Sequence, residues 1–120
     1  MTKDYRDITQ RVSASLATFR ADMPELMKAF GALSQASMRD GALTHKTKEL
    51  IALCIGVAGH CDACIGFHIK ALVKLGATRS EIEEALAVAV YMGGGPSLMY
   101  ATDALSALEQ MSTSTTSVAA

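Results

Sequence analysis

The sequence predicts an all-α protein with a single domain of about six helices. Hydrophobic residues make up 50% of the 120 residues, aromatic residues only 5%, and there are just two prolines. Residues that favour helices dominate, and the alternation of apolar and polar residues that marks strands is rare. A chain of this length has room for one hydrophobic core. We therefore expect one domain over residues 1–111, followed by a disordered, Ser/Thr-rich tail over residues 112–120.

Two helices are expected in the first third of the chain. The first runs from about Asp4 to Phe19, and a turn at residues 21–24 separates it from the second, which ends near Met38. Pro24 suits the first turn of a helix, because the N–H that proline lacks has no intrahelical partner there. Three apolar side chains recur at helical spacing and predict the buried stripe of the second helix: Met27, Phe30 and Leu33.

The middle of the chain predicts two further helices joined by a short turn. Thr44 is expected to cap a third helix over residues 46–58, which is apolar on nearly every side after Glu49 and is therefore central. The pair at residues 59–60 breaks this helix. A fourth helix begins near Asp62 and stops at Gly76, because glycine readily adopts the left-handed conformation that ends helices.

The last two predicted helices are marked by a capping box and by a glycine run. The segment Thr78-Arg79-Ser80-Glu81 has the capping-box pattern and opens a fifth helix that runs through Tyr91. The run Gly93-Gly94-Gly95-Pro96 ends that helix, and its proline can open a sixth helix that reaches about Gln110.

Charge and cysteine content exclude several classes of function. The formal net charge is −1 and no basic run occurs, so we expect no nucleic-acid partner and no anionic membrane surface. The longest uncharged apolar run, residues 50–59, is too short to span a bilayer. The first 11 residues are polar and charged, unlike a signal peptide, and three cysteines are an odd count for a secreted disulfide scaffold. These features predict a cytoplasmic protein.

The apolar content exceeds what short helices in one domain can bury. Two patches, residues 86–90 and residues 98–101, are candidates for contact with other subunits, although each could equally be core. We expect a homo-oligomer rather than a monomer.

The segment Cys61-Asp62-Ala63-Cys64-Ile65-Gly66-Phe67-His68 contains the main chemical signal. Two thiols spaced this way can close a disulfide, and an imidazole follows the second thiol by four residues, which places it on the same helix face. In a reducing compartment a CxxC pair is more typical of redox chemistry than of structure. A chance occurrence and half of a metal site are the alternatives.

Spacing favours Cys64 as the reactive thiol and Cys61 as the resolving thiol. Both lie at a predicted helix start, where free N–H groups and the helix dipole stabilise a thiolate. His68 adds a proton acceptor beside Cys64. The opposite assignment stays open, because in many helix-start CxxC enzymes the first, more exposed cysteine attacks.

Glu49 is the candidate acidic partner of this motif. If the third and fourth helices pack antiparallel, its carboxylate can reach His68 or Cys61 and shuttle protons. The alternative is a solvated carboxylate in the first turn of its helix. Cys54 is read as a packing residue, and His45 as a surface residue.

Together these residues resemble a known family. Glu49, eleven intervening residues, then Cys61-x-x-Cys64-x-x-x-His68 is similar to the AhpD-like, or alkylhydroperoxidase-like, branch of the carboxymuconolactone decarboxylase family. The flanking segments at residues 48–53 and 67–72, and the later landmarks at residues 75–82 and 92–96, extend the resemblance over residues 25–108.

The resemblance implies an all-helical fold that assembles into trimers or hexamers. It also implies a thiol-dependent peroxidase or disulfide reductase in which Cys64 attacks hydroperoxide, Cys61 resolves the product, and His68 and Glu49 relay protons. Such a scheme needs no cofactor and no metal. Ala63 departs from the pattern, because the better-studied AhpD enzymes carry a second histidine there.

Four functional readings follow from the sequence. The first is a peroxidase that reduces a small hydroperoxide and is itself reduced by a dithiol protein or a small thiol. The second is a protein disulfide oxidoreductase with little peroxidase activity. The third is a metal-binding module that uses the cysteine pair with His68, with Glu49 as a further ligand. The fourth is a structural oligomer with an idle dithiol.

Overall fold

The computed structural model describes residues 3–119, with side chains described over residues 3–112. Within the described range the chain forms six helices and no strand, so the predicted all-α fold class is confirmed. The helices are α1 (Tyr5–Asp22), α2 (Pro24–Met38), α3 (His45–Ala58), α4 (Asp62–Lys74), α5 (Arg79–Gly93) and α6 (Gly95–Ala119).

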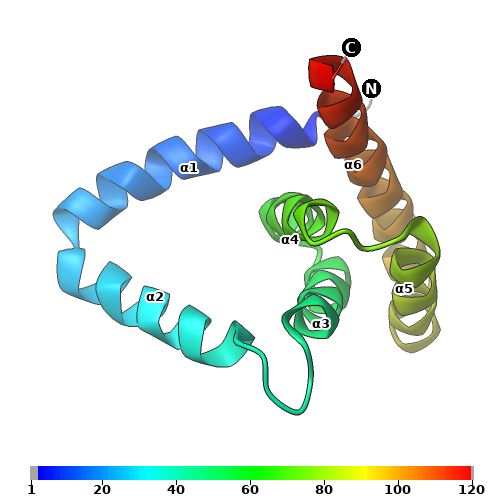
Figure 1. Ribbon diagram of the computed structural model, residues 1–120, viewed down its shortest axis with the longest axis horizontal. Coiled ribbons are helices and arrows are strands. Elements are labelled where there is room, and N and C mark those ends of the chain that lie inside the picture. The colour runs from blue at the N-terminus through cyan, green and yellow to red at the C-terminus, as the bar shows by residue number, and fades with distance from the viewer. Residues whose placement is uncertain (1–2, 120) are drawn as a thin grey trace.

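Helices α3, α4, α5 and α6 pack around one hydrophobic core, and the first turns of α1 close one side of it. Figure 1 shows α1 and α2 extending away from this four-helix body as an arm. The largest fully buried apolar side chains come from α1, α3, α4 and α5: Tyr5, Leu53, Val57, Ile65, Ile69, Leu72 and Ile82. The core thus holds α3 and α4, which bear the predicted chemical residues, at its centre.

The predicted buried stripe of α2 is wrong. No residue of α2 is buried, and the Phe30 and Leu33 side chains are 63% and 60% exposed, while Met27 is half-buried. The reason is the position of the helix: α2 contacts the end of α1 and the start of α3 and otherwise lies apart from the body (Figure 1). Periodicity shows that a helix face is apolar, but it does not show what covers that face.

The predicted helix starts and the stop of α4 are confirmed. The hydroxyl of Thr44 accepts the N–H of Thr47 at the start of α3, and Thr78 and Glu81 form the reciprocal capping box at the start of α5. Gly76 follows α4 with φ +77°, the left-handed conformation that glycine adopts without a steric cost.

The predicted end of α6 near Gln110 is too early, since the helix continues to Ala119. Residues 111–119 contain neither glycine nor proline. Each Ser or Thr costs a helix only about 0.5 kcal/mol relative to Ala, so the segment can remain helical. The predicted tail at 112–120 falls mostly on residues outside the described side chains, and Ala120 lies outside the described backbone.

The turn between α3 and α4 is a Schellman motif that delivers Cys61 to the start of α4. The N–H of His60 donates to Val57 O (3.1 Å) and the N–H of Cys61 donates to Gly56 O (2.9 Å). His60 occupies the left-handed position, with φ +56°, as a non-glycine residue. Its ring stacks on that of Tyr100 from α6, with centroids 4.6 Å apart and planes 6° from parallel.

The left-handed backbone and the aromatic stack of His60 predict different stability effects for two substitutions. His60→Ala loses the stack and keeps the backbone cost, so it lowers the free energy of unfolding by about 1 kcal/mol. His60→Gly loses the stack but removes a backbone cost of about 1 kcal/mol, so it stays close to the wild type. Urea unfolding measures the difference, and an alanine variant as stable as the glycine variant would contradict this account.

Candidate active site

Cys61 and Cys64 form a disulfide at the amino end of α4. Cys61 is the N-cap residue, its Cα lies 5.2 Å from that of Cys64, and its Sγ accepts the backbone N–H of Cys64 at 3.1 Å. Both cysteines are partly exposed. The pair is therefore placed where free backbone N–H groups and the helix dipole favour negative charge on sulfur, and where solvent reaches it.

Two glycines let the neighbouring helices approach α4 closely beside the disulfide. A Cβ atom added to Gly56 of α3 would lie 2.9 Å from Cys64 Cβ, and one added to Gly66 of α4 would lie 2.7 Å from Thr9 Cγ2 of α1. Neither distance occurs between well-packed carbon atoms. Because Gly56 has no side chain, α3 can pack close to the cysteine pair.

Glu49 of α3 contacts His68 of α4 across this crossing. Glu49 is buried, with 7% of its surface exposed, and its Oε1 lies 2.6 Å from His68 Nδ1. The solvated-carboxylate alternative for Glu49 is therefore wrong. A carboxylate only accepts hydrogen bonds, so His68 donates from Nδ1, and in the neutral ring Nε2 is then free to accept a proton. His68 lies one helical turn after Cys64, on the same face.

A second imidazole, that of His45, reaches the same carboxylate, although the sequence predicts a surface residue at this position. His45 Nε2 lies 3.1 Å from the other oxygen of Glu49, Oε2. The His45 side chain is 41% exposed, so it connects the buried carboxylate to solvent. The missed signal is the spacing of four residues between His45 and Glu49, which places both side chains on one face of α3.

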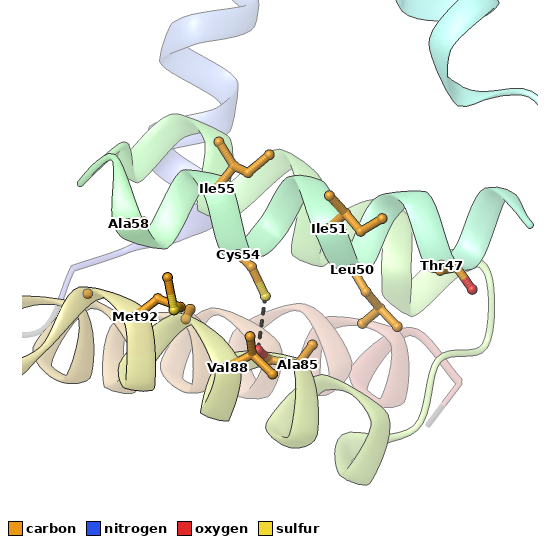
Figure 2. A pocket seen from close by; sticks show the side chains of 11 residues that line it. Thr47, Leu50, Ile51, Cys54, Ile55, Ala58, Ala85, Val88 and Met92 are labelled. Atoms are coloured by element: carbon orange, nitrogen blue, oxygen red, sulfur yellow. Dashed lines mark hydrogen bonds between the residues drawn. The ribbon is translucent and has the colours of Figure 1, made fainter. Parts of the chain in front are cut away.

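Cys54 lies in a different environment from the disulfide pair. Its thiol donates to Ala85 O at 3.1 Å and faces an apolar groove of about 490 Å³ between α3 and α5 (Figure 2). Burial raises the pKa of the Cys54 thiol, which disfavours the thiolate that nucleophilic chemistry needs. Cys54 packs against the hydrophobic core, as predicted from the sequence.

Among residues 3–112, no group of three or more His, Cys, Asp or Glu side chains is placed to hold a metal ion. In the described part of the chain, none of the helices combines the length and apolar character needed to cross a bilayer. The site itself combines a cysteine pair with an adjacent imidazole–carboxylate pair.

Comparisons with known proteins place the chain in a family. The model of the carboxymuconolactone decarboxylase family matches residues 24–107. A crystal structure of a family protein from Legionella pneumophila is 57% identical, covers 90% of this chain and 96% of its own, and superposes with a TM-score of 0.89. A family protein from Thermotoga maritima, for which a part in an antioxidative response has been suggested, is 32% identical, covers 86% and 88%, and has a TM-score of 0.77.

An uncharacterized protein from Cupriavidus necator is 36% identical over 105 residues, which is 88% of this chain and 93% of that protein. The family match covers the Glu49 to His68 motif and extends almost as far as the sequence resemblance predicted. The chain belongs to the carboxymuconolactone decarboxylase family.

Proposed function

We propose that the protein is a thiol-dependent hydroperoxide reductase that cycles through the Cys61–Cys64 disulfide. The observation that carries this proposal is the disulfide at the start of α4, one helical turn from an imidazole that a buried carboxylate orients. The antioxidative role suggested for the similar Thermotoga maritima protein supports the same chemistry.

The proposed cycle balances two electrons and two protons. The Cys64 thiolate attacks one oxygen of the hydroperoxide, the O–O bond breaks, and the alcohol leaves with the proton that His68 took from the thiol. Cys64 is then a sulfenic acid. The Cys61 thiol condenses with it to form the disulfide and releases water. A reducing dithiol protein or a small thiol restores both thiols by exchange, so no cofactor takes part.

The proton relay in this proposal contains two histidines. Glu49 holds the Nδ1–H of His68, which leaves Nε2 as the base for Cys64, and His45 contacts the second carboxylate oxygen from the solvent side. Ala63 lacks the imidazole that related peroxidases have next to the attacking cysteine. His45 brings a second imidazole to the same proton network by a different route.

A protein disulfide oxidoreductase is the second candidate. The partial exposure of both cysteines at a helix start favours it, because a partner protein can reach them directly. The two candidates share the disulfide and differ in whether peroxide oxidises it.

We also propose that the protein works in the cytoplasm as a homo-oligomer, a trimer or a hexamer. The support for assembly is the exposure of large apolar side chains on several helices, with Phe30 63%, Ile55 66%, Val88 62% and Met92 77% exposed. A soluble chain this small seldom leaves so many of these side chains in water.

The peroxidase cycle predicts distinct outcomes for the three cysteines. When reduced protein is mixed with cumene hydroperoxide in a stopped-flow instrument, the wild type and Cys54→Ala lose two thiols per peroxide. Cys64→Ser does not react, because the nucleophile is absent. Cys61→Ser stops at a sulfenic acid that dimedone traps. If the wild type keeps all its thiols at micromolar peroxide but exchanges rapidly with a protein disulfide, the protein is a disulfide oxidoreductase instead.

The relay predicts graded losses of rate. Glu49→Gln slows the oxidation of Cys64 by peroxide about 100-fold, because an amide can donate to His68 and select the wrong tautomer. His45→Ala causes a smaller loss and changes the pH profile of the rate. Glu84→Gln, an exposed carboxylate on α5, is the matched control and leaves the rate unchanged. Equal rates for Glu49→Gln and the control would exclude the relay.

Assembly predicts a mass of three or six chains in size-exclusion chromatography with light scattering. Phe30→Glu shifts the mass downward without unfolding the chain, because this side chain packs in no core of the single subunit. Gln35→Glu, also exposed on α2, adds the same charge at a polar site and keeps the mass of the wild type. A wild-type monomer at micromolar concentration would contradict the proposal.

A further inference from the structure

Asp62, the first residue of α4, lies between the two cysteines and is bound by the amino-terminal segment of the chain. Asp62 Oδ1 accepts a hydrogen bond from Lys3 Nζ at 2.9 Å and from the hydroxyl of Tyr5 at 3.1 Å. These partners are 59 and 57 residues away in sequence. The Asp62 side chain is only 36% exposed, so its charge is partly removed from solvent screening.

Lys3 is fixed in place by contacts with α6 in addition to its contact with α4. Its Nζ lies 2.9 Å from Asp103 Oδ2 and 4.7 Å from the centre of the Tyr100 ring, both on α6. Its backbone oxygen accepts from Gln110 Nε2 at 2.7 Å, and the oxygen of the same amide accepts the N–H of Tyr5 at 2.8 Å. The start of α1 therefore lies beside α6, as Figure 1 shows. Lys3, which precedes α1, places its ammonium group against Asp62 of the CxxC segment.

The surroundings keep these two partners in their hydrogen-bond-donating forms. Hydrogen bonds to Asp62 and Asp103 raise the pKa of Lys3, so the ammonium stays charged. Burial, followed by the nearby carboxylates, raises the pKa of Tyr5, so the phenol stays neutral and donates its proton. The result is one cation shared between two carboxylates, with a phenol as an additional donor to Asp62.

An unpaired carboxylate at Asp62 would oppose the chemistry of its neighbours. The helix start stabilises one negative charge well, and both the Asp62 carboxylate and a cysteine thiolate compete for it. Two like charges close together each disfavour the ionised form of the other. Pairing Asp62 with Lys3 and Tyr5 removes this competition and leaves the helix terminus to the thiolate.

We propose that Lys3 and Tyr5 are positioning residues that neutralise Asp62 and thereby set the acidity of the reduced cysteine pair and the ease with which its disulfide is reduced. This inference rests on the proposed function only in that the Cys61–Cys64 pair cycles between dithiol and disulfide. Other ionisable groups surround the pair from the packed elements and stay unchanged in the comparison: Glu49 and His45 on α3, His60 in the turn, His68 on α4, and Tyr100 and Asp103 on α6.

The test measures the cysteines themselves and uses no peroxide. The thiol pKa is followed by the ultraviolet absorbance of the thiolate, and the reduction equilibrium by titration against glutathione. Lys3→Met leaves the Asp62 carboxylate without its ammonium partner, so it raises the thiol pKa and makes the disulfide harder to reduce. The expected change in the reduction equilibrium constant is roughly threefold to tenfold, which corresponds to about 15–30 mV. Asp62→Asn shifts both quantities in the opposite direction.

Further variants separate charge from structure. Lys3→Arg keeps the charge and restores wild-type values, Tyr5→Phe gives a smaller shift of the same sign as Lys3→Met, and Lys3→Met has a reduced effect when Asp62→Asn is already present. Lys74→Met, on the exposed last turn of α4, is the control and changes nothing.

The outcomes distinguish this inference from the proposed function. Shifts of the same sign for Lys3→Met and Asp62→Asn, or a potential that none of the variants changes, would overturn the role of Lys3 while leaving the redox cycle intact. A wild-type protein that forms no Cys61–Cys64 disulfide at any glutathione ratio would overturn both.

Discussion

Helices α3 and α4 can share one site because they cross closely where Gly56 faces Cys64. The crossing leaves no room for a Cβ atom at Gly56, and the Schellman turn that ends α3 delivers Cys61 to the first position of α4. The same antiparallel pair brings Glu49 to within 2.6 Å of His68. Local backbone geometry thus assembles sulfur, base and carboxylate from two adjacent helices, and a larger residue at Gly56 would separate all three.

The two carboxylates near this crossing, Glu49 and Asp62, are both hydrogen-bonded to other side chains. Glu49 is 7% exposed and uses each carboxylate oxygen on a different imidazole. Asp62 is held by an ammonium and a phenol from the amino-terminal segment. Because a buried charge without a partner is costly, these contacts stabilise the fold, and under the proposal above the pairing of Asp62 also leaves the start of α4 to a cysteine thiolate.

Most of the fold and the centre of the site could be predicted from local patterns. The caps at Thr44 and Thr78 and the stop at Gly76 depend on neighbouring residues, and counting helical turns from the break at residues 59–60 placed Glu49 near His68. Two features could not be read from the sequence, because they depend on contacts between segments that are distant along the chain. The apolar face of α2 is left exposed by the described part of the chain, and Lys3 meets Asp62 because the start of α1 packs on the four-helix body. His45 was a different kind of omission, because its spacing from Glu49 was visible in the sequence.

In the proposed cycle, Cys64 is the sulfur that is ionised near neutral pH, assisted by the helix start and by His68. The measurement that tests this most directly is the rate at which iodoacetamide alkylates each cysteine of the fully reduced protein, resolved by mass spectrometry of the peptides across a range of pH. We expect Cys64 to be modified well before Cys61 and Cys54 at neutral pH, as the proposed cycle requires. Modification of Cys61 first, or equal rates for all three thiols, would contradict it.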